Sequence, residues 1–327
     1  MGERTLPLGD MTDFAFLFPG QASQFVGMGK DLYEESAAAR AIFDEADEVM
    51  GTALTELCFS GPREALQQTA ITQPAVFVHS VAACRLLQAH GLEPAFVAGH
   101  SLGEYSALVA AGSLAYREGL ELVKRRGQLM QQAGADSPGT MAAIIGLDDE
   151  VVSALCQQAG EAGTVVAANF NAPGQVAVSG ETAAVERVRE LALEAGAKRA
   201  LELEVSGAFH SPLMEPAARE MREILQEAEI RTPGSPVVTN VAARPVGHPE
   251  ELRKHLIAQI TQPVRWTESI LSLHANGVVR AAEVGPGAVL KGLVRRIERR
   301  MRVISAGTAA DLAAAAANIG TGQASRR

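Results

Sequence analysis

Short apolar runs and longer segments with helical spacing follow one another along the first part of this chain. Phe14–Phe18 is a run of apolar residues that Pro19 and Gly20 end, which predicts a buried strand. Further along, hydrophobic residues recur every three or four positions, as they do on one face of a helix. These patterns predict strands at 14–18 and 95–98, and helices at 31–50, 73–90, 105–112 and 116–132.

The order of elements changes after 135–139, an Ala-Asp-Ser-Pro-Gly segment. Strands are predicted at 140–145, 165–169, 175–179 and 200–205, and helices at 149–159 and 182–195. This β-α-β-β-α-β order is typical of a ferredoxin-like unit, here of about 70 residues. An alternating α/β pattern then resumes, with strands at 237–239, 278–283 and 301–305 and helices at 250–259, 267–275 and 288–299.

We therefore expect an α/β protein in which a ferredoxin-like small subdomain, 137–206, interrupts a larger catalytic subdomain formed by 13–136 and 207–308. Residues 1–12 and 309–327 are expected to be flexible termini, because neither continues the pattern of the fold, and the second, which is rich in alanine, is expected to form a final helix or a frayed tail. The first of these segments lacks the apolar centre of a signal peptide. No apolar run reaches about 18 residues, so a membrane-spanning helix is not expected.

Composition narrows the class of protein further. Hydrophobic residues make up 47% of the 327 positions, which is ample for a large buried core. The net charge of −9 argues against nucleic acid as the main partner. The cysteines Cys58, Cys84 and Cys156 are odd in number and show no metal-ligand spacing. We expect them to be reduced, buried residues of a cytoplasmic protein, and we predict no metal site.

The most informative motif is Gly99-His-Ser101-Leu-Gly103, a G-x-S-x-G sequence between a predicted strand and a predicted helix. In that context the chain turns sharply and presents the serine hydroxyl at the edge of a sheet, as in the α/β-hydrolases. Glycines permit the tight turn, and the helix N-terminus offers N–H groups to an oxyanion. We therefore expect an α/β-hydrolase-like large subdomain with Ser101 as candidate nucleophile; a purely structural glycine turn is the alternative.

A serine at neutral pH needs a base to take its proton, and seven histidines are candidates. His100 adjoins Ser101 and is expected to brace the turn, while His90 is expected at a helix end and His79 in the core. Three others lie in polar helical surroundings: His248, His255 and His274. His210 follows directly after the inserted unit, on a loop at a domain junction, where active sites often lie. It is therefore the candidate base.

Six motifs occur in order along the chain: Phe18-Pro-Gly-Gln-Ala-Ser-Gln24, Gly99-His-Ser-Leu-Gly-Glu104, Asn171-Ala-Pro-Gly-Gln175, Gly207-Ala-Phe-His210, Gln262-Pro-Val-Arg-Trp266 and Glu283-Val-Gly-Pro-Gly287. Together they resemble the malonyl-CoA:acyl-carrier-protein transacylase family, and the related acyltransferase domains of polyketide synthases share the pattern. The resemblance runs from Phe14 to Ser305, nearly the whole chain. Ala22 departs from it, because many members have glycine there; such a change would tighten the loop that it lies in.

The resemblance implies a role for each matching position. Ser101 would accept the acyl group as an ester, and His210 would serve as general base and then as general acid. A backbone carbonyl at Gln259, rather than a carboxylate, would hold the imidazole in its reactive tautomer. The backbone N–H groups of Gln21 and Leu102 would form the oxyanion hole, where losing one donor costs about 2.7–4 kcal/mol of barrier.

The resemblance also suggests which acyl group is carried. Arg126 would bind the free carboxylate of a malonyl group, since a planar guanidinium can donate two parallel hydrogen bonds to it. An acetyl group would leave that charge unpaired, a penalty on the order of 2–5 kcal/mol. Lys124 and Arg125 are expected on a solvated helix face. Phe209 resembles the malonyl form of the related polyketide domains, where its ring would crowd a branched acyl group; a plain core role is the alternative.

The implied partners are malonyl-CoA and a phosphopantetheinylated acyl carrier protein, with no bound cofactor, no nucleic acid and no membrane. Carrier proteins are acidic, so a basic docking patch is expected. Lys198 and Arg199 are candidates for contact with the carrier or with coenzyme A, as is the basic cluster Arg295, Arg296, Arg299 and Arg300. Exposed helix charge is the competing explanation. The family resemblance favours a monomer.

Three functions compete at this stage. The first is a ping-pong malonyl transferase, which serves either fatty-acid or polyketide synthesis. The second is a serine hydrolase or thioesterase, against which stand Arg126 and the lack of an acidic third member of a triad. The third is a carrier-binding scaffold with an inactive site, against which stand the intact Ser101 and His210.

Overall fold

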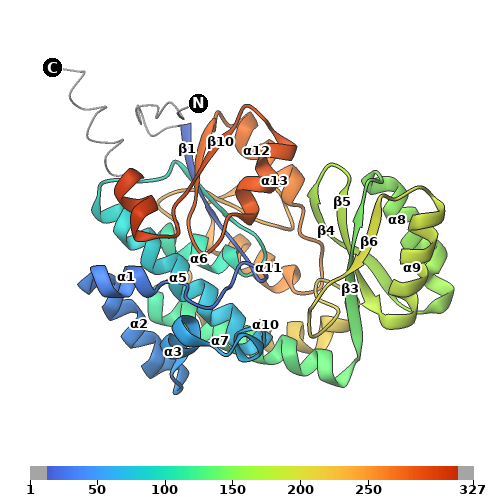
Figure 1. The fold of residues 1–327 in the computed structure, drawn as a ribbon, viewed down its shortest axis with the longest axis horizontal. Coiled ribbons are helices and arrows are strands. Elements are labelled where there is room, and N and C mark those ends of the chain that lie inside the picture. Colours follow the sequence, from blue (N-terminus) through green and yellow to red (C-terminus); the bar gives the residue numbers. More distant parts are fainter. Residues whose placement is uncertain (1–12, 316–327) are drawn as a thin grey trace.

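The computed structural model describes residues 13–315, which form two β-sheets with helices packed around them (Figure 1). The strands are β1 (Phe14–Phe18), β2 (Phe96–Gly99), β3 (Gly139–Ile145), β4 (Val165–Ala172), β5 (Gln175–Glu181), β6 (Arg199–Glu202), β7 (Val237–Val238), β8 (Pro245–Val246), β9 (Arg280–Glu283) and β10 (Arg302–Ser305). One sheet has the order β10-β9-β1-β2-β7-β8 and the other β4-β5-β3-β6. The fold is therefore a mixed α/β fold.

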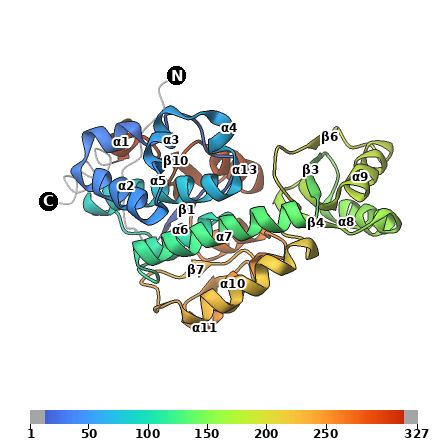
Figure 2. The same ribbon diagram turned by 90° about the horizontal axis from the view of Figure 1, so that it is seen from below.

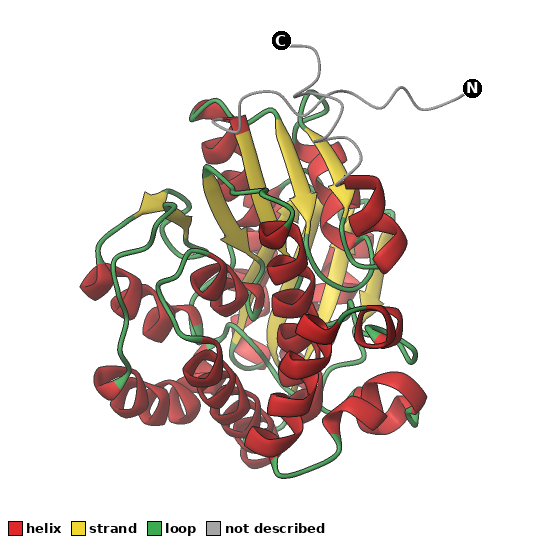
Figure 3. Ribbon diagram, turned by 90° about the vertical axis from the view of Figure 1, so that its left-hand side faces the viewer, coloured by secondary structure: helices red, strands yellow, loops and turns green. Residues whose placement is uncertain are grey.

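The α-helices are α1 (Lys30–Glu35), α2 (Ala37–Met50), α3 (Leu54–Ser60), α4 (Arg63–Leu66), α5 (Thr69–Ala89), α6 (Gly103–Ala110), α7 (Tyr116–Asp136), α8 (Asp149–Gln158), α9 (Thr182–Glu194), α10 (Glu215–Glu227), α11 (Pro249–Gln259), α12 (Trp266–Ala275) and α13 (Val289–Ile297). Short 3₁₀ helices are η2 (Ala159–Ala162) and η3 (Pro212–Met214). The helices flank both faces of the larger sheet (Figure 3).

The larger sheet is buried on both faces, as its central strand shows. Strand β1 pairs in parallel with β2 and β9, and only β8, at one edge, runs antiparallel to its neighbour. Along β1, Phe14, Phe16 and Phe18 belong to the same core as buried residues of α2, α5 and α7. The alternate residues Ala15 and Leu17 pack into a second core with α12 and α13. Two-sided burial explains why this strand is apolar at every position.

Helix α5 is largely buried in this core, and it is the one described helix that is long and apolar enough to span a membrane. Its most apolar window is 78% buried inside the protein. Such burial is the pattern of a core helix, whose apolar surface is covered by its neighbours α2, α6 and α7.

The smaller sheet is antiparallel, with α8 and α9 packed on one face (Figure 1). On β3, Ala142 and Ile144 face these helices, whereas Met141 and Ala143 face the other way and line a cavity. The long helix α7 runs from the larger sheet to the start of β3 (Figure 2). The second face of the small sheet is thereby turned toward the large one.

Most predicted elements are present within a few residues, and the differences have local causes. The helix predicted at 31–50 is two helices, because Ser36 has extended backbone and caps α2 through its side chain. Helix α10 was not predicted. Residues 309–315 are helical, as in the final helix that was one of the two expectations for this terminus, and Leu312 and Ala315 are buried in the main core. The rest of that segment, 316–327, and the other terminus, 1–12, lie outside the described residues.

Candidate active site

Ser101 lies in the sharp turn between β2 and α6, with a positive φ of 50°. The two glycines of the motif are required by close backbone packing. A Cβ on Gly99 would lie 1.9 Å from the carbonyl carbon of Gly103, and one on Gly103 would lie 2.1 Å from the carbonyl oxygen of Phe18. No larger residue fits either position without moving the backbone. The strand–turn–helix geometry expected from the sequence is therefore present.

His210 lies within hydrogen-bond distance of this serine. The Ser101 Oγ to His210 Nε2 distance is 2.8 Å, and His210 Nδ1 lies 2.7 Å from the backbone carbonyl oxygen of Gln259. A carbonyl only accepts, so Nδ1 must carry the proton and donate it. Nε2 is then the acceptor for the Ser101 hydroxyl. His210 itself has a positive φ of 58°, so both members of the pair sit in a backbone region that favours glycine.

The imidazole of His210 is held in its neutral form. Burial, together with the neighbouring positive charge of Arg126, lowers the pKa of His210 to about 3. The hydrogen bond to the Gln259 carbonyl acts against this shift. A neutral imidazole with Nε2 free to accept is the form that a general base requires.

Arg126 reaches the same serine from α7. Its side chain is 1% exposed. Nη1 donates to Gln73 Oε1 at 2.6 Å, while Nη2 donates to Gln259 Oε1 at 2.9 Å and to Ser101 Oγ at 3.1 Å. Its Nε has no hydrogen-bond partner within residues 13–315. Ser101 Oγ thus accepts from a guanidinium and donates to an imidazole.

The positions predicted for the oxyanion hole border the same cavity. Gln21 and Leu102 both line it, and neither backbone N–H donates to an acceptor in the described part of the chain. The Gln21 side chain donates to Thr69 Oγ1 at 3.3 Å. Ala22, where the family resemblance leads us to expect glycine, has a positive φ of 78°. Its backbone is therefore strained in the way that its departure from glycine would predict.

The cavity that contains these groups has a volume of about 240 Å³ and lies between the two sheets. The large-sheet side contributes Ser101, His210 and Arg126, together with Phe209, which is 6% exposed. The small-sheet side contributes wall residues of β3, β4 and β5: Met141, Ala143, Asn169, Asn171, Gln175 and Ala177. Hydrophobic walls around a few convergent polar groups are typical of a small-molecule site.

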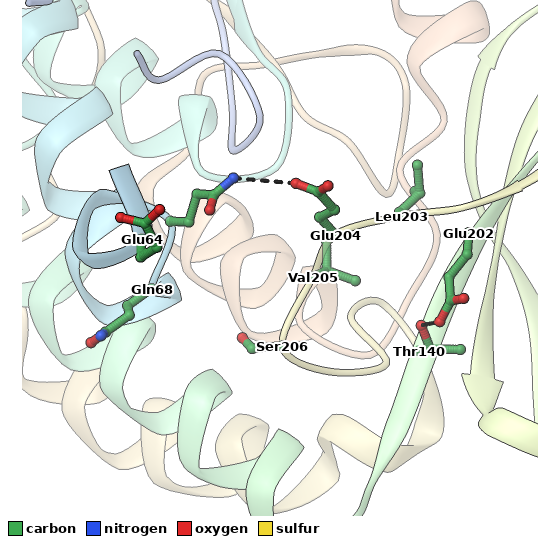
Figure 4. A pocket seen from close by; sticks show the side chains of 9 residues that line it. Glu64, Gln68, Thr140, Glu202, Leu203, Glu204, Val205 and Ser206 are labelled. Atoms are coloured by element: carbon green, nitrogen blue, oxygen red, sulfur yellow. Dashed lines mark hydrogen bonds between the residues drawn. The ribbon is translucent and has the colours of Figure 1, made fainter. Parts of the chain in front are cut away.

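A second, wider hollow of about 620 Å³ adjoins the first, and Leu203 and Val205 line both. It carries the carboxylates of Glu64, Glu202 and Glu204 (Figure 4). Gln67 donates to Glu204, and Thr140 donates to Glu202. Its acidic lining repels an anionic ligand and it contains no nucleophile–base pair, so the smaller cavity is the candidate active site.

The remaining predicted residues lie elsewhere. Lys198 and Arg199 are exposed at the start of β6 and do not line the cavity. Arg296 of α13 lies nearer, since its Nη1 donates to the cavity residue Gln175 at 2.6 Å. His100 braces the turn as expected, with Nε2 2.8 Å from Asn171 Oδ1.

The other sequence expectations concern residues outside the cavity. His79 is buried, and its Nε2 lies 2.8 Å from the carbonyl oxygen of Gly307. The cysteines are buried and unpaired: Cys58, Cys84 and Cys156. Among residues 13–315, no group of three or more His, Cys, Asp or Glu side chains could hold a metal ion.

Three side chains that support the site were missed by the sequence analysis. Asn240 Oδ1 accepts from the Ser101 backbone N–H at 2.7 Å, and Asn240 Nδ2 donates to the Gly99 carbonyl at 2.6 Å. Gln73 accepts a hydrogen bond from Arg126, and Glu104 accepts one from Gln259, which in turn contacts Arg126. Asn240 had a usable signal, because it follows β7, the parallel neighbour of β2, at the carboxyl edge of the sheet.

A half-buried serine in contact with a buried histidine and a buried arginine fits the site of an acyl transferase, and the comparisons agree. Residues 15–319 match the acyl transferase domain family. The chain is 47% identical to a malonyl CoA-acyl carrier protein transacylase of Bacillus subtilis over 90% of this chain and 93% of that protein. It therefore belongs to the malonyl CoA-acyl carrier protein transacylase family and is an acyltransferase.

Solved structures of similar proteins have the same fold. An acyl carrier protein S-malonyltransferase of Vibrio cholerae superposes with a TM-score of 0.89 at 48% identity, covering 92% of this chain and 99% of that one. A malonyl transacylase in complex with its type II polyketide synthase acyl carrier protein superposes with a TM-score of 0.91 at 42% identity, covering 94% and 99%.

Proposed function

We propose that this chain transfers the malonyl group of malonyl-CoA to the phosphopantetheine thiol of an acyl carrier protein, through an ester on Ser101. The observation that carries the proposal is Arg126, a buried cation whose Nη2 lies 3.1 Å from the serine oxygen. A guanidinium at that position matches an acyl group that ends in a carboxylate. The names of the most similar relatives point to the same substrate.

In the first half-reaction, His210 Nε2 takes the proton of Ser101 as Oγ attacks the thioester carbonyl carbon. The backbone N–H groups of Gln21 and Leu102 receive the oxyanion. When the C–S bond breaks, the coenzyme A thiolate takes the proton from His210, and the malonyl group stays on Oγ. Throughout this half-reaction Arg126 binds the malonyl carboxylate, which it engages as the donor enters and before Ser101 attacks.

In the second half-reaction, the carrier thiol gives its proton to His210 and its sulfur attacks the ester carbonyl. The Ser101 oxygen leaves and regains the proton from His210, which restores the starting state. The two substrates use one acid–base pair in turn, as a ping-pong mechanism requires. The apolar cavity walls limit hydrolysis of the ester between the two steps.

We further propose the finer organisation that the fold suggests: an α/β-hydrolase-like subdomain, 13–136 and 207–308, interrupted by a ferredoxin-like one, 137–206. The β-α-β-β-α-β order and the β4-β5-β3-β6 sheet support this division. The protein is proposed to act as a cytoplasmic monomer without a bound cofactor, membrane or nucleic acid. Lys198, Arg199 and Arg296 are its proposed contacts with the carrier or coenzyme A, since all three are exposed and cationic.

The test is the formation and fate of an acyl-enzyme. Wild-type protein mixed with malonyl-CoA, methylmalonyl-CoA and acetyl-CoA in parallel should gain mass fastest with the malonyl donor. Ser101→Ala should gain none, and an adduct that survives would overturn the assignment of the nucleophile. Release of the group to a carrier thiol rather than to water separates a transferase from a hydrolase.

A further inference from the structure

Arg126 is a buried cation with no anion in contact with it in the part of the chain that the structure describes. The partners of its guanidinium are two neutral amide oxygens, of Gln73 and Gln259, and the Ser101 hydroxyl. No carboxylate lies within 4.0 Å of it among residues 13–315. A charge removed from water without a counter-charge is costly, so an anion is expected close by.

Glu104 is a buried carboxylate, and the side chain of Gln259 lies between it and Arg126. Glu104 is 1% exposed and sits in the first turn of α6, where the helix dipole favours a negative charge. Its Oε2 accepts from the Asn240 backbone N–H at 2.8 Å and from Gln259 Nε2 at 3.0 Å. Since Nε2 points to Glu104, Gln259 Oε1 is left to accept from Arg126 at 2.9 Å. A single amide thus separates the two charges.

We propose that Glu104 is the counter-charge of Arg126, held out of contact by the side-chain amide of Gln259 so that the guanidinium stays available to the substrate carboxylate. A direct ion pair would occupy the donors that the substrate needs, whereas a distant carboxylate lowers the cost of burying the cation without competing for them. The inference rests on the proposed function, because it assumes that Arg126 binds a carboxylate.

The surroundings of Glu104 act on its charge in two opposite directions. Burial raises the pKa of Glu104 to about 7, which favours the uncharged acid, whereas the hydrogen bonds from Asn240 and Gln259 and the charge of Arg126 lower the pKa and favour the carboxylate. The same amide of Gln259 also donates to the Ser101 carbonyl at 3.1 Å. Fixing its orientation therefore positions the serine turn and the arginine together.

Two variants test the proposal by removing or moving the charge. Glu104→Gln removes it and keeps an oxygen that can accept both hydrogen bonds. Glu104→Gln with Gln259→Glu moves the carboxylate into contact with Arg126 at constant net charge. The probe is malonate itself, measured by calorimetry, together with the ratio of malonyl to acetyl transfer onto the enzyme.

Removing the charge should tighten malonate binding by about fivefold, because Arg126 then lacks its counter-charge. Moving the charge should weaken malonate binding and lower the malonyl-to-acetyl ratio by about a hundredfold, because the donors are occupied. Glu56→Gln, an exposed first-turn glutamate of α3, is the matched control and should change neither. Unchanged or weaker binding by Glu104→Gln, or wild-type binding by the swapped variant, would overturn the proposal.

Malonate binding by the variants distinguishes a failure of the proposed function from a failure of the role proposed for Glu104. If Arg126→Ala binds malonate as the wild type does, the proposed function is wrong. If it loses malonate but Glu104→Gln does not bind it more tightly, only the role of Glu104 is wrong. A urea melt checks that each variant is folded, and where one of the two Glu104 variants does not fold, the other decides.

Discussion

Replacing Arg126 by alanine should change which acyl group this enzyme accepts. The substitution removes the buried guanidinium and its donors to Gln73, Gln259 and the Ser101 oxygen. For a malonyl donor, losing a buried partner of the carboxylate costs about 2–5 kcal/mol. At 1.36 kcal/mol per factor of ten, kcat/KM for malonyl-CoA should fall by roughly 30-fold to 5,000-fold.

An acetyl donor should respond in the opposite direction. It has no carboxylate, so in the wild type it leaves the buried charge of Arg126 unpaired within the cavity. Removing the cation removes that penalty, and acetyl transfer should be maintained or should rise. In Arg126→Ala, acyl-enzyme formation should therefore become slower with malonyl-CoA and equal or faster with acetyl-CoA, rather than slower with both donors.

The assay is the rate of acyl-enzyme formation, followed by intact mass after rapid mixing with malonyl-CoA or acetyl-CoA. Arg125→Ala is the matched control, because Arg125 is the neighbouring residue on the same helix but is exposed and contacts Gln128 and Glu220. It should behave as the wild type does. Equal losses for the two donors in Arg126→Ala would refute the argument and make Arg126 a structural residue.

Three further predictions concern the base, the serine turn and the oxyanion loop. Because burial and Arg126 hold the pKa of His210 at about 3, the base stays neutral as the pH falls through 6.5, and a pH–rate profile of malonyl-enzyme formation should show no loss there; a limb near 6.5 would contradict this. Asn240→Ala should slow acylation by about tenfold to a hundredfold with little change in KM, measured by steady-state kinetics, since the Ser101 N–H loses its buried acceptor. Ala22→Gly should raise the free energy of unfolding by up to about 1 kcal/mol in a urea melt, because glycine relieves the positive φ; a lower value would count against strain.

Much of the fold could be predicted from periodicity, because its central elements are long or strongly patterned. β1 and α7 begin at the predicted residues. The continuous apolar run of β1 is typical of a buried strand, and the regularly spaced hydrophobic residues of α7 are typical of a helix with one buried face. Helix α10 was missed although its buried residues, among them Ala217, Met221 and Leu225, are spaced for a helix. This helical spacing begins only a few residues after His210, directly behind the motif that was interpreted as part of the active site.

The site was predictable only where a local pattern carries it. The turn at Ser101 requires Gly99 and Gly103 for steric reasons, so it has a signature in the sequence. Glu104 and Asn240 have no such steric signature, because their roles arise from contacts between residues 136 positions apart, and only the place of Asn240 after a predicted strand marks it. Such partners are brought together by the pairing of β2 with β7, which no short stretch of sequence encodes.

The two sides of the cavity contribute different kinds of residue, so the range of acyl groups that it accepts can change separately from the chemistry. The reacting groups and Arg126 come from one side, whereas Met141, Ala143 and Ala177 come from the antiparallel sheet. Substitutions on that second side alter the room for an acyl chain without contacting the proton-transfer pair. The fold therefore lets acyl size evolve, or be engineered, independently of the chemistry that moves the group.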